Sequence, residues 1–164
     1  MVARGRTPGG RSERDMKTLS EQFQDPARRK ALVDDALTVL DQEVQDKSGL
    51  TGMAIKGGYK LVQGFRPGFV RQVVESLLDD FLVALNPVYA EAVEKKRPAD
   101  AYLVEKRDQV ADALLSVTDR RAEGAQSGAI QAAYQKLRPI AKKQVEAAAP
   151  RLGSLLQRHA EPTA

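Results

Sequence analysis

The sequence predicts an all-α domain, and three observations carry this prediction. Alanine, leucine and long charged side chains are abundant, whereas aromatic residues make up only 5% of the chain; this mix favours helices, where such side chains lose little freedom. Apolar residues recur three and four positions apart along most of the chain, which is the period of an amphipathic helix. No stretch alternates convincingly with a period of two, so we expect a bundle of about six helices.

Length and composition indicate a single globular domain. The chain has 164 residues, enough for one domain with a core and too few to expect two. We expect this domain over residues 16–160, behind a disordered basic tail at residues 1–15 that has almost nothing to bury. No signal peptide is visible, and no apolar run approaches the roughly 20 residues of a membrane span, so we expect a cytoplasmic protein.

The first long helix is expected to begin at Pro26. Asp25 can cap its free N–H groups, and proline fits the first helical position, where no N–H is needed. Its apolar face is formed by Val33, Leu37, Leu40 and Val44. Gly49 is suited to follow a helix end, so we expect this helix to end near Lys47.

Two helices follow, separated by a break at residues 66–68. The first starts at Thr51 and is apolar around most of its circumference, so we expect it to be buried on most sides. Its glycine pair, Gly57 and Gly58, would then allow a neighbouring helix to approach closely. The second helix has so wide an apolar face that we expect it to lie at the centre of the fold; we expect Pro87 to interrupt it, with a shorter helix over residues 87–96.

The second half of the chain predicts two further long helices. One starts at residues 98–100 and has its apolar face at Leu103, Val110, Leu114 and Val117. After a loop at residues 124–127, an apolar period of three and four continues almost to the C-terminus. Because this period passes through Pro139 and Pro150 without interruption, we expect kinks or very short breaks there.

The two halves share a sequence pattern. Residues 52–68 and 128–139 both contain Ala-Ile, then Tyr, then Arg-Pro. The equivalent positions, 72 to 75 residues apart, are Pro26 and Pro98, Val44 and Val117, Asp46 and Asp119, Tyr59 and Tyr134, and Arg66 and Arg138. This pattern predicts an internal duplication of a three-helix unit over residues 25–85 and 98–158. A chance match between two amphipathic helices built from a small set of residue types is the alternative.

Basic residues gather in two windows that contain no acidic residue. Between Asp46 and Glu75, and again between Glu123 and Glu146, every charged residue is Lys or Arg. The candidate polyanion-binding residues are Lys47, Lys56, Lys60, Arg66 and Arg71 in the window 47–71, and Lys136, Arg138, Lys142 and Lys143 in the window 136–143. Such bases could bind nucleic-acid phosphates, an acidic protein or anionic lipid headgroups. The alternative is ordinary solvated helix faces that are balanced by acidic helices packed alongside.

The chain is poor in histidine and cysteine, two residue types that act in catalysis and bind metal ions. His159 is the only histidine, and near the end of the last helix its cation would complement the helix dipole. The acid pairs Asp34-Asp35 and Asp79-Asp80 are adjacent, so their side chains point about 100° apart on a helix and form no two-carboxylate site. The chain has no cysteine, which excludes thiolate metal sites and cysteine nucleophiles. We therefore predict no catalytic residue, no metal, no cofactor and no enzymatic activity.

Several short motifs indicate a family. The run Asp-Lys-Ser-Gly-Leu-Thr-Gly at residues 46–52, then Tyr59, Arg66-Pro67 and Ala-Pro-Arg-Leu-Gly at residues 149–153 resemble a family of small all-helical bacterial proteins of unknown function. The resemblance covers about residues 16–160 and omits the basic tail. It implies no catalytic residue, cofactor or partner.

The function that we expect first is a non-catalytic interaction or structural module that binds another protein. The alternative is a weak, sequence-independent nucleic-acid binder that uses the tail and the two basic windows. A third hypothesis is a helical carrier of an apolar ligand. Self-association into a homo-oligomer is compatible with each of them.

Overall fold

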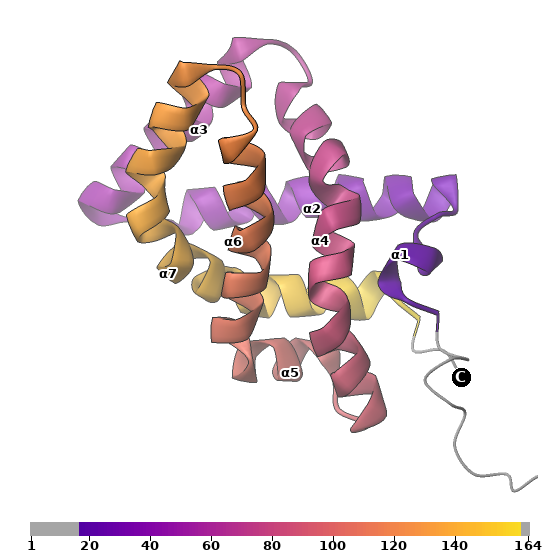
Figure 1. The fold of residues 1–164 in the computed structure, drawn as a ribbon. Helices are drawn as coiled ribbons and strands as arrows, with labels where there is room; N and C mark the ends of the chain where they lie inside the picture. The colour runs from indigo at the N-terminus through magenta and orange to yellow at the C-terminus, as the bar shows by residue number, and fades with distance from the viewer. Residues whose placement is uncertain (1–16, 162–164) are drawn as a thin grey trace, which may run out of the picture.

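The computed structural model describes residues 17–161, so the tail predicted at residues 1–15 lies outside the described residues. Within this part the chain forms seven helices and no strand, which confirms the predicted all-α class (Figure 1). The helices are α1 (Leu19–Gln22), α2 (Pro26–Asp46), α3 (Gly49–Phe65), α4 (Phe69–Glu94), α5 (Ala99–Glu105), α6 (Arg107–Glu123) and α7 (Gly128–His159). None of these described helices is both long and apolar enough to cross a membrane.

Helix α2 begins as its sequence predicts. The Asp25 carboxylate accepts a hydrogen bond of 3.0 Å from the backbone N–H of Arg28, and Pro26 occupies the first helical position. The helix ends at Asp46, next to the predicted end at Lys47. The local chemistry of caps and proline was therefore sufficient to predict both ends of this element.

Three helix boundaries differ from the prediction, and the first is the start of α3, which begins at Gly49 and not at Thr51. Helix α4 continues through Pro87, because the residues on both sides of it, Leu85 and Val88, lie on one buried face whose packing offsets the lost backbone hydrogen bond. The helix expected from residue 98 onward is divided at Lys106 into α5 and α6. Helix α7 agrees with the expected period: it runs through both of its prolines without a break and bends part-way along its length, as one of the two expected alternatives, a kink, requires (Figure 1).

The core lies between two packed helix pairs, α4 with α6 and α2 with α7, which are joined by packing of α4 against α2 and of α6 against α7 (Figure 1). Helix α4 packs against α1, α2, α3, α5 and α6, which confirms its predicted central position. The buried side chains of this core include Phe23, Leu32, Val33, Leu82, Val88, Tyr102, Leu103, Val110, Leu155 and Leu156. They come from every helix except α3.

The acid pairs connect helices to one another. The Asp35 carboxylate of α2 accepts hydrogen bonds from Arg158 at 2.8 Å and lies 2.7 Å from Nε2 of His159, both in the last turn of α7. Burial alone would raise the pKa of Asp35, but the hydrogen bonds from His159 and Arg158 hold it below its usual value. Asp79 binds Arg29 at 2.7 Å. These acids therefore form ion pairs between helices.

The repeated tyrosine binds an aspartate in each half, but these aspartates are not equivalent positions of the repeat, and the two halves differ in chain path. Tyr59 of α3 donates a hydrogen bond of 2.6 Å to Asp41 of α2, and Tyr134 of α7 hydrogen-bonds to Asp119 of α6. In each half, the repeated tyrosine thus binds an aspartate of a preceding helix. The repeated Arg-Pro separates α3 from α4 in the first half and lies inside α7 in the second. The internal duplication stays a prediction.

Candidate docking surface

Helix α3 lies on the outside of the molecule, contrary to the prediction that it would be buried on most sides. Among its residues only Gly52 is buried, while the side chains of Leu50, Leu61 and Phe65 are 87%, 79% and 71% exposed. The apolar pattern predicted a covering layer on several sides. The structure instead fills the core with the other helices, and within residues 17–161 the main packing of α3 is against α2 and α4.

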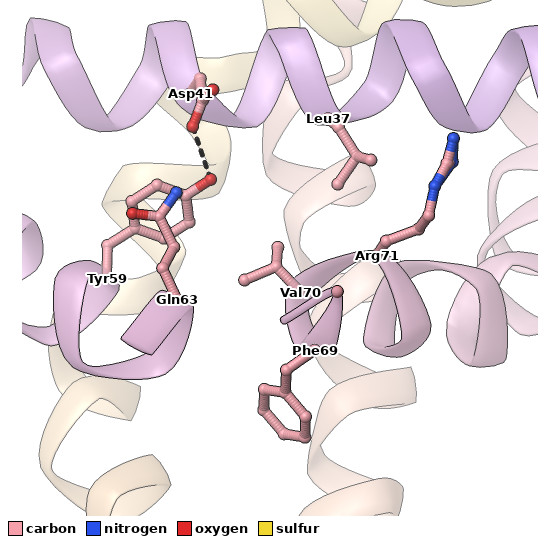
Figure 2. A pocket seen from close by; sticks show the side chains of 8 residues that line it. Leu37, Asp41, Tyr59, Gln63, Phe69, Val70 and Arg71 are labelled. Atoms are coloured by element: carbon pink, nitrogen blue, oxygen red, sulfur yellow. Dashed lines mark hydrogen bonds between the residues drawn. The ribbon is translucent and has the colours of Figure 1, made fainter. Parts of the chain in front are cut away.

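The inner side of α3 is narrow. Ile55, Gly58 and Tyr59 are partly buried towards the body of the molecule, and the Tyr59 hydroxyl anchors the helix to Asp41 of α2 (Figure 2). Burial and the neighbouring Asp41 carboxylate raise the pKa of Tyr59 to about 12. Contacts on this single side hold the helix in its position. The rest of its circumference is exposed.

Three glycines of α3, Gly57, Gly58 and Gly64, are not required by any packing within the described chain, whereas Gly52 is buried against the backbone of Lys47. A Cβ atom added to Gly57, Gly58 or Gly64 would meet no atom within 4 Å. The expectation that the glycine pair allows close approach of a neighbouring helix is therefore wrong for the chain by itself. Each of these residues makes the helix less stable than alanine would, by roughly 0.5–1 kcal/mol.

The N-terminal part of α7 is exposed in a similar way. The side chains of Ile130 and Leu137 project into solvent. On another side of this helix, Tyr134 and Arg138 hold it to α6 through Asp119, which Arg138 approaches to 2.8 Å. Hydrogen bonds from Arg138 and Tyr134 lower the pKa of Asp119.

Four of the nine predicted polyanion-binding residues form ion pairs with carboxylates. Lys47 binds Glu43 at 3.2 Å, and Lys142 lies 2.7 Å from Asp108 and 3.0 Å from Asp112. The other two pairs are Arg71 with Asp34 and Arg138 with Asp119. The acidic partners come from α2 and α6, together with Glu75 of α4, which lies 3.8 Å from Arg71. Neighbouring carboxylates therefore neutralise part of both basic windows.

The other five predicted bases have no carboxylate partner among residues 17–161. These are Lys56, Lys60, Arg66, Lys136 and Lys143, and all are exposed. The Arg66 guanidinium donates to the side-chain oxygen of Gln72 at 2.7 Å and lies 5.2 Å from the centre of the Phe69 ring. The unpaired bases therefore lie on α3, at its end, and on α7, beside the exposed apolar side chains.

We call this combined surface the docking face. It consists of the exposed apolar residues Leu50, Met53, Leu61, Val62, Phe65, Ile130 and Leu137 and the unpaired bases Lys56, Lys60, Arg66, Lys136 and Lys143. The turn between α3 and α4 and the turn between α6 and α7 lie at the same end of the molecule (Figure 1). A hydrogen bond of 2.7 Å from Arg121, late in α6, to the carbonyl of Ser76, early in α4, joins the two helix pairs near this end.

An open hollow of about 320 Å³ lies where α3 and the start of α4 diverge from α2 (Figure 2). Leu37, Phe69 and Val70 line it with apolar atoms, and Asp41 and Arg71 contribute charge. Its volume is at the lower end of the range of small-molecule sites. The mixed lining combines apolar and charged groups, and the Tyr59–Asp41 hydrogen bond closes one side of it.

The only histidine has the structural position that the sequence predicted, in the last turn of α7. Its Nε2 faces Asp35, and its backbone carbonyl accepts a hydrogen bond of 2.9 Å from Arg28. Among residues 17–161, no group of three or more His, Cys, Asp or Glu side chains is placed to hold a metal ion.

These observations define the class of protein: it is all-helical, and it has an exposed face that is both apolar and cationic. The chain belongs to the family of unknown function DUF6918, which matches residues 19–160. This match confirms the resemblance to a family of unknown function over nearly the same residues; the bacterial origin stays a prediction. No curated protein and no solved structure matches the chain.

Proposed function

We propose that the protein is a non-catalytic cytoplasmic binding protein, whose docking face binds a partner that is both apolar and anionic. The observation that carries this proposal is the exposure of α3, an apolar helix that has no acidic residue and whose outer side chains are not covered by any of residues 17–161. Large apolar patches on the surface of a soluble protein are uncommon, and they mark sites of interaction.

The charge of the docking face indicates the sign of its partner. Lys56 and Lys60 accompany the exposed apolar side chains of α3, and the nearest acidic residues in the sequence are Asp46 and Glu75, outside the helix. A partner that carries negative charge would therefore meet attraction and no repulsion from α3.

The nucleic-acid alternative uses the same bases but explains less of the surface. Phosphate contacts require cations and hydrogen-bond donors. They leave the exposure of Leu50, Leu61 and Phe65 without a role. A partner with both apolar and anionic groups uses the whole docking face.

The proposal is tested by capture of partners from cell extract that retains its membranes, with matched variants. Leu61→Gln/Phe65→Gln removes two apolar side chains of the docking face. Val83→Gln is the control, because Val83 of α4 is 62% exposed but lies outside both basic windows. We expect protein or lipid components that the wild type and Val83→Gln retain and that Leu61→Gln/Phe65→Gln loses. If all three proteins retain the same components, the docking face has no binding role.

A further inference from the structure

We propose that the docking face binds the surface of a membrane that contains anionic phospholipids, with α3 lying in the headgroup region, parallel to the bilayer. This inference rests on the proposed function and names the class of its partner. An interfacial helix of this kind has apolar residues on one side and lysine or arginine on the other, and it lies in the plane of the membrane surface. The arrangement of side chains around α3 matches this description in three respects.

The first respect is the width of the exposed apolar surface. At about 100° per residue, Met53 and Val62 lie at the two edges of an arc that covers about half of the helix circumference. Between them lie Leu50, Leu61 and Phe65, all exposed. A single partner helix needs a stripe about 100° wide. A lipid surface covers a wider arc, because a helix that lies in the interface immerses its whole apolar side.

The second respect is the position of the bases. Lys56 and Lys60 lie beside the Met53 edge of the arc, and Arg66 follows the last turn of α3 as its C-terminal cap residue. These bases can extend along the apolar surface and place their charges among lipid phosphates. Because none of these three residues has a carboxylate partner in the described chain, their charges are available to the headgroups.

The third respect is a second exposed segment with the same character. Helix α7 begins at the end of the molecule where α3 ends (Figure 1), and its exposed Ile130 and Leu137 are accompanied by the unpaired Lys136. Phe65, the last residue of α3, also lies close to Phe69, the first residue of α4: their ring centres are 5.0 Å apart, and Arg66 stands between them in the sequence. The start of α7 therefore offers an anionic surface the same kinds of group as α3 does.

A second copy of the chain fits the charges less well. Pairing of α3 with α3 of another copy would place Lys56 and Lys60 near the same residues of the partner, with no carboxylate on either helix to compensate. Nucleic acid would use the bases and leave the apolar arc in water. The charge and the apolar arc together therefore favour anionic lipid.

The test is flotation of the full-length protein with vesicles. Vesicles of phosphatidylcholine alone are compared with vesicles that also contain phosphatidylglycerol, at low and raised salt. We expect binding only with phosphatidylglycerol, weakened by salt. Lys56→Gln/Lys60→Gln should weaken it roughly 25-fold, because each base near an anionic surface contributes about fivefold. Leu61→Gln/Phe65→Gln should weaken it at least about tenfold, and Val83→Gln should bind like the wild type.

Three results would overturn the inference: no flotation with phosphatidylglycerol vesicles, equal flotation with both vesicle types, or equal loss in Val83→Gln. Circular dichroism of each variant shows whether it is folded. If vesicles do not bind but extract capture still retains a protein that Leu61→Gln/Phe65→Gln loses, the membrane inference is wrong and the proposed function stands with an acidic protein as partner. If light scattering shows that the docking face joins two copies, the partner is the chain itself. If neither vesicles nor extract components bind, both proposals fail.

Discussion

Gly153 illustrates how a single residue determines the packing of two helices. It is buried where α7 crosses the start of α5, and a Cβ atom at this position would lie 2.6 Å from the Cα of Asp100 and 2.9 Å from its carbonyl oxygen. Backbone atoms cannot rotate away as a side chain can, so the two helices would have to separate. The glycine therefore allows α5 and α7 to approach each other at this distance.

We predict that Gly153→Ala lowers the free energy of unfolding by about 1–3 kcal/mol, as overpacking in a close interface does. Gly64→Ala is the matched control, since an added Cβ there would meet nothing within 4 Å. This control should raise the free energy of unfolding by roughly 0.5–1 kcal/mol through helix propensity alone. Urea denaturation of both variants gives the two values. Equal effects of the two substitutions would contradict the packing assigned to Gly153.

The Asp35 carboxylate predicts a pH dependence of stability. Its pKa in the folded chain is lowered, so it contributes stability above the unfolded value of about 3.9, and this contribution is lost as the pH falls through the folded value. Asp35→Asn should therefore be less stable than the wild type near neutral pH, and the difference should shrink as the pH falls below about 4. Urea midpoints measured from about pH 6 to about pH 3 test this.

The control for this prediction is Asp79→Asn, because the Asp79 side chain is 71% exposed although it also pairs with an arginine. Its removal should change stability by less than about 1 kcal/mol. A difference between Asp35→Asn and the wild type that stays constant down to the lowest pH would show that the loss comes from packing and not from the charge of Asp35.

At the scale of residues, the sequence identified charges but not their partners. The positions of all nine bases, and the absence of acidic residues between them in each window, can be read directly from the sequence. Whether a base is free depends on contacts between helices, such as that of Lys142 with Asp108 and Asp112. Those carboxylates lie about 30 residues earlier in the chain, and only the fold brings them to the lysine.

At the scale of elements, α3 combines a sequence that predicts burial with an exposed position. Periodicity shows that a helix has an apolar side, but it does not show what covers that side. The same pattern in α4 is covered by five other helices, and in α3 it is covered on one narrow side only. The apolar content of α3 was thus predicted correctly, and its environment was not.

Exposure of α3 predicts that its outer side chains contribute little to stability. Leu61→Gln/Phe65→Gln should change the free energy of unfolding by no more than about 0.5 kcal/mol, the usual range for surface substitutions. Leu82→Ala, at a core position that is 2% exposed, should cost about 2–5 kcal/mol. Chemical denaturation of the isolated protein at low concentration measures both. A large loss in the α3 variant would mean that these side chains are covered in the free chain.

Helix boundaries were predictable where local chemistry decides them. The cap at Asp25 and the break after Phe65, where Gly68 adopts a φ of 75°, follow from residue types alone. The continuation of α4 through Pro87 does not, because burial on both sides of the proline outweighs the local signal. The division between α5 and α6 at Lys106 likewise has no proline or glycine to indicate it.

At the scale of the whole molecule, the fold separates stability from binding. The core is formed by α1, α2, α4, α5, α6 and the C-terminal part of α7, with ion pairs from Arg151 and Arg158 joining α7 to α2. Helix α3 and the start of α7 lie outside this core and carry the docking face. The surface can therefore engage a partner without rearrangement of the core.

The central claim is that the apolar side of α3 is uncovered in the free protein and becomes covered by an anionic membrane surface. Because the chain has no tryptophan, Phe65→Trp introduces a single fluorescent reporter into the docking face. We predict the emission of a water-exposed indole in the free protein, and a shift to shorter wavelength on addition of phosphatidylglycerol vesicles but not of phosphatidylcholine vesicles. Emission that already indicates a buried indole in the dilute free protein, or that does not change with anionic vesicles, would contradict this claim.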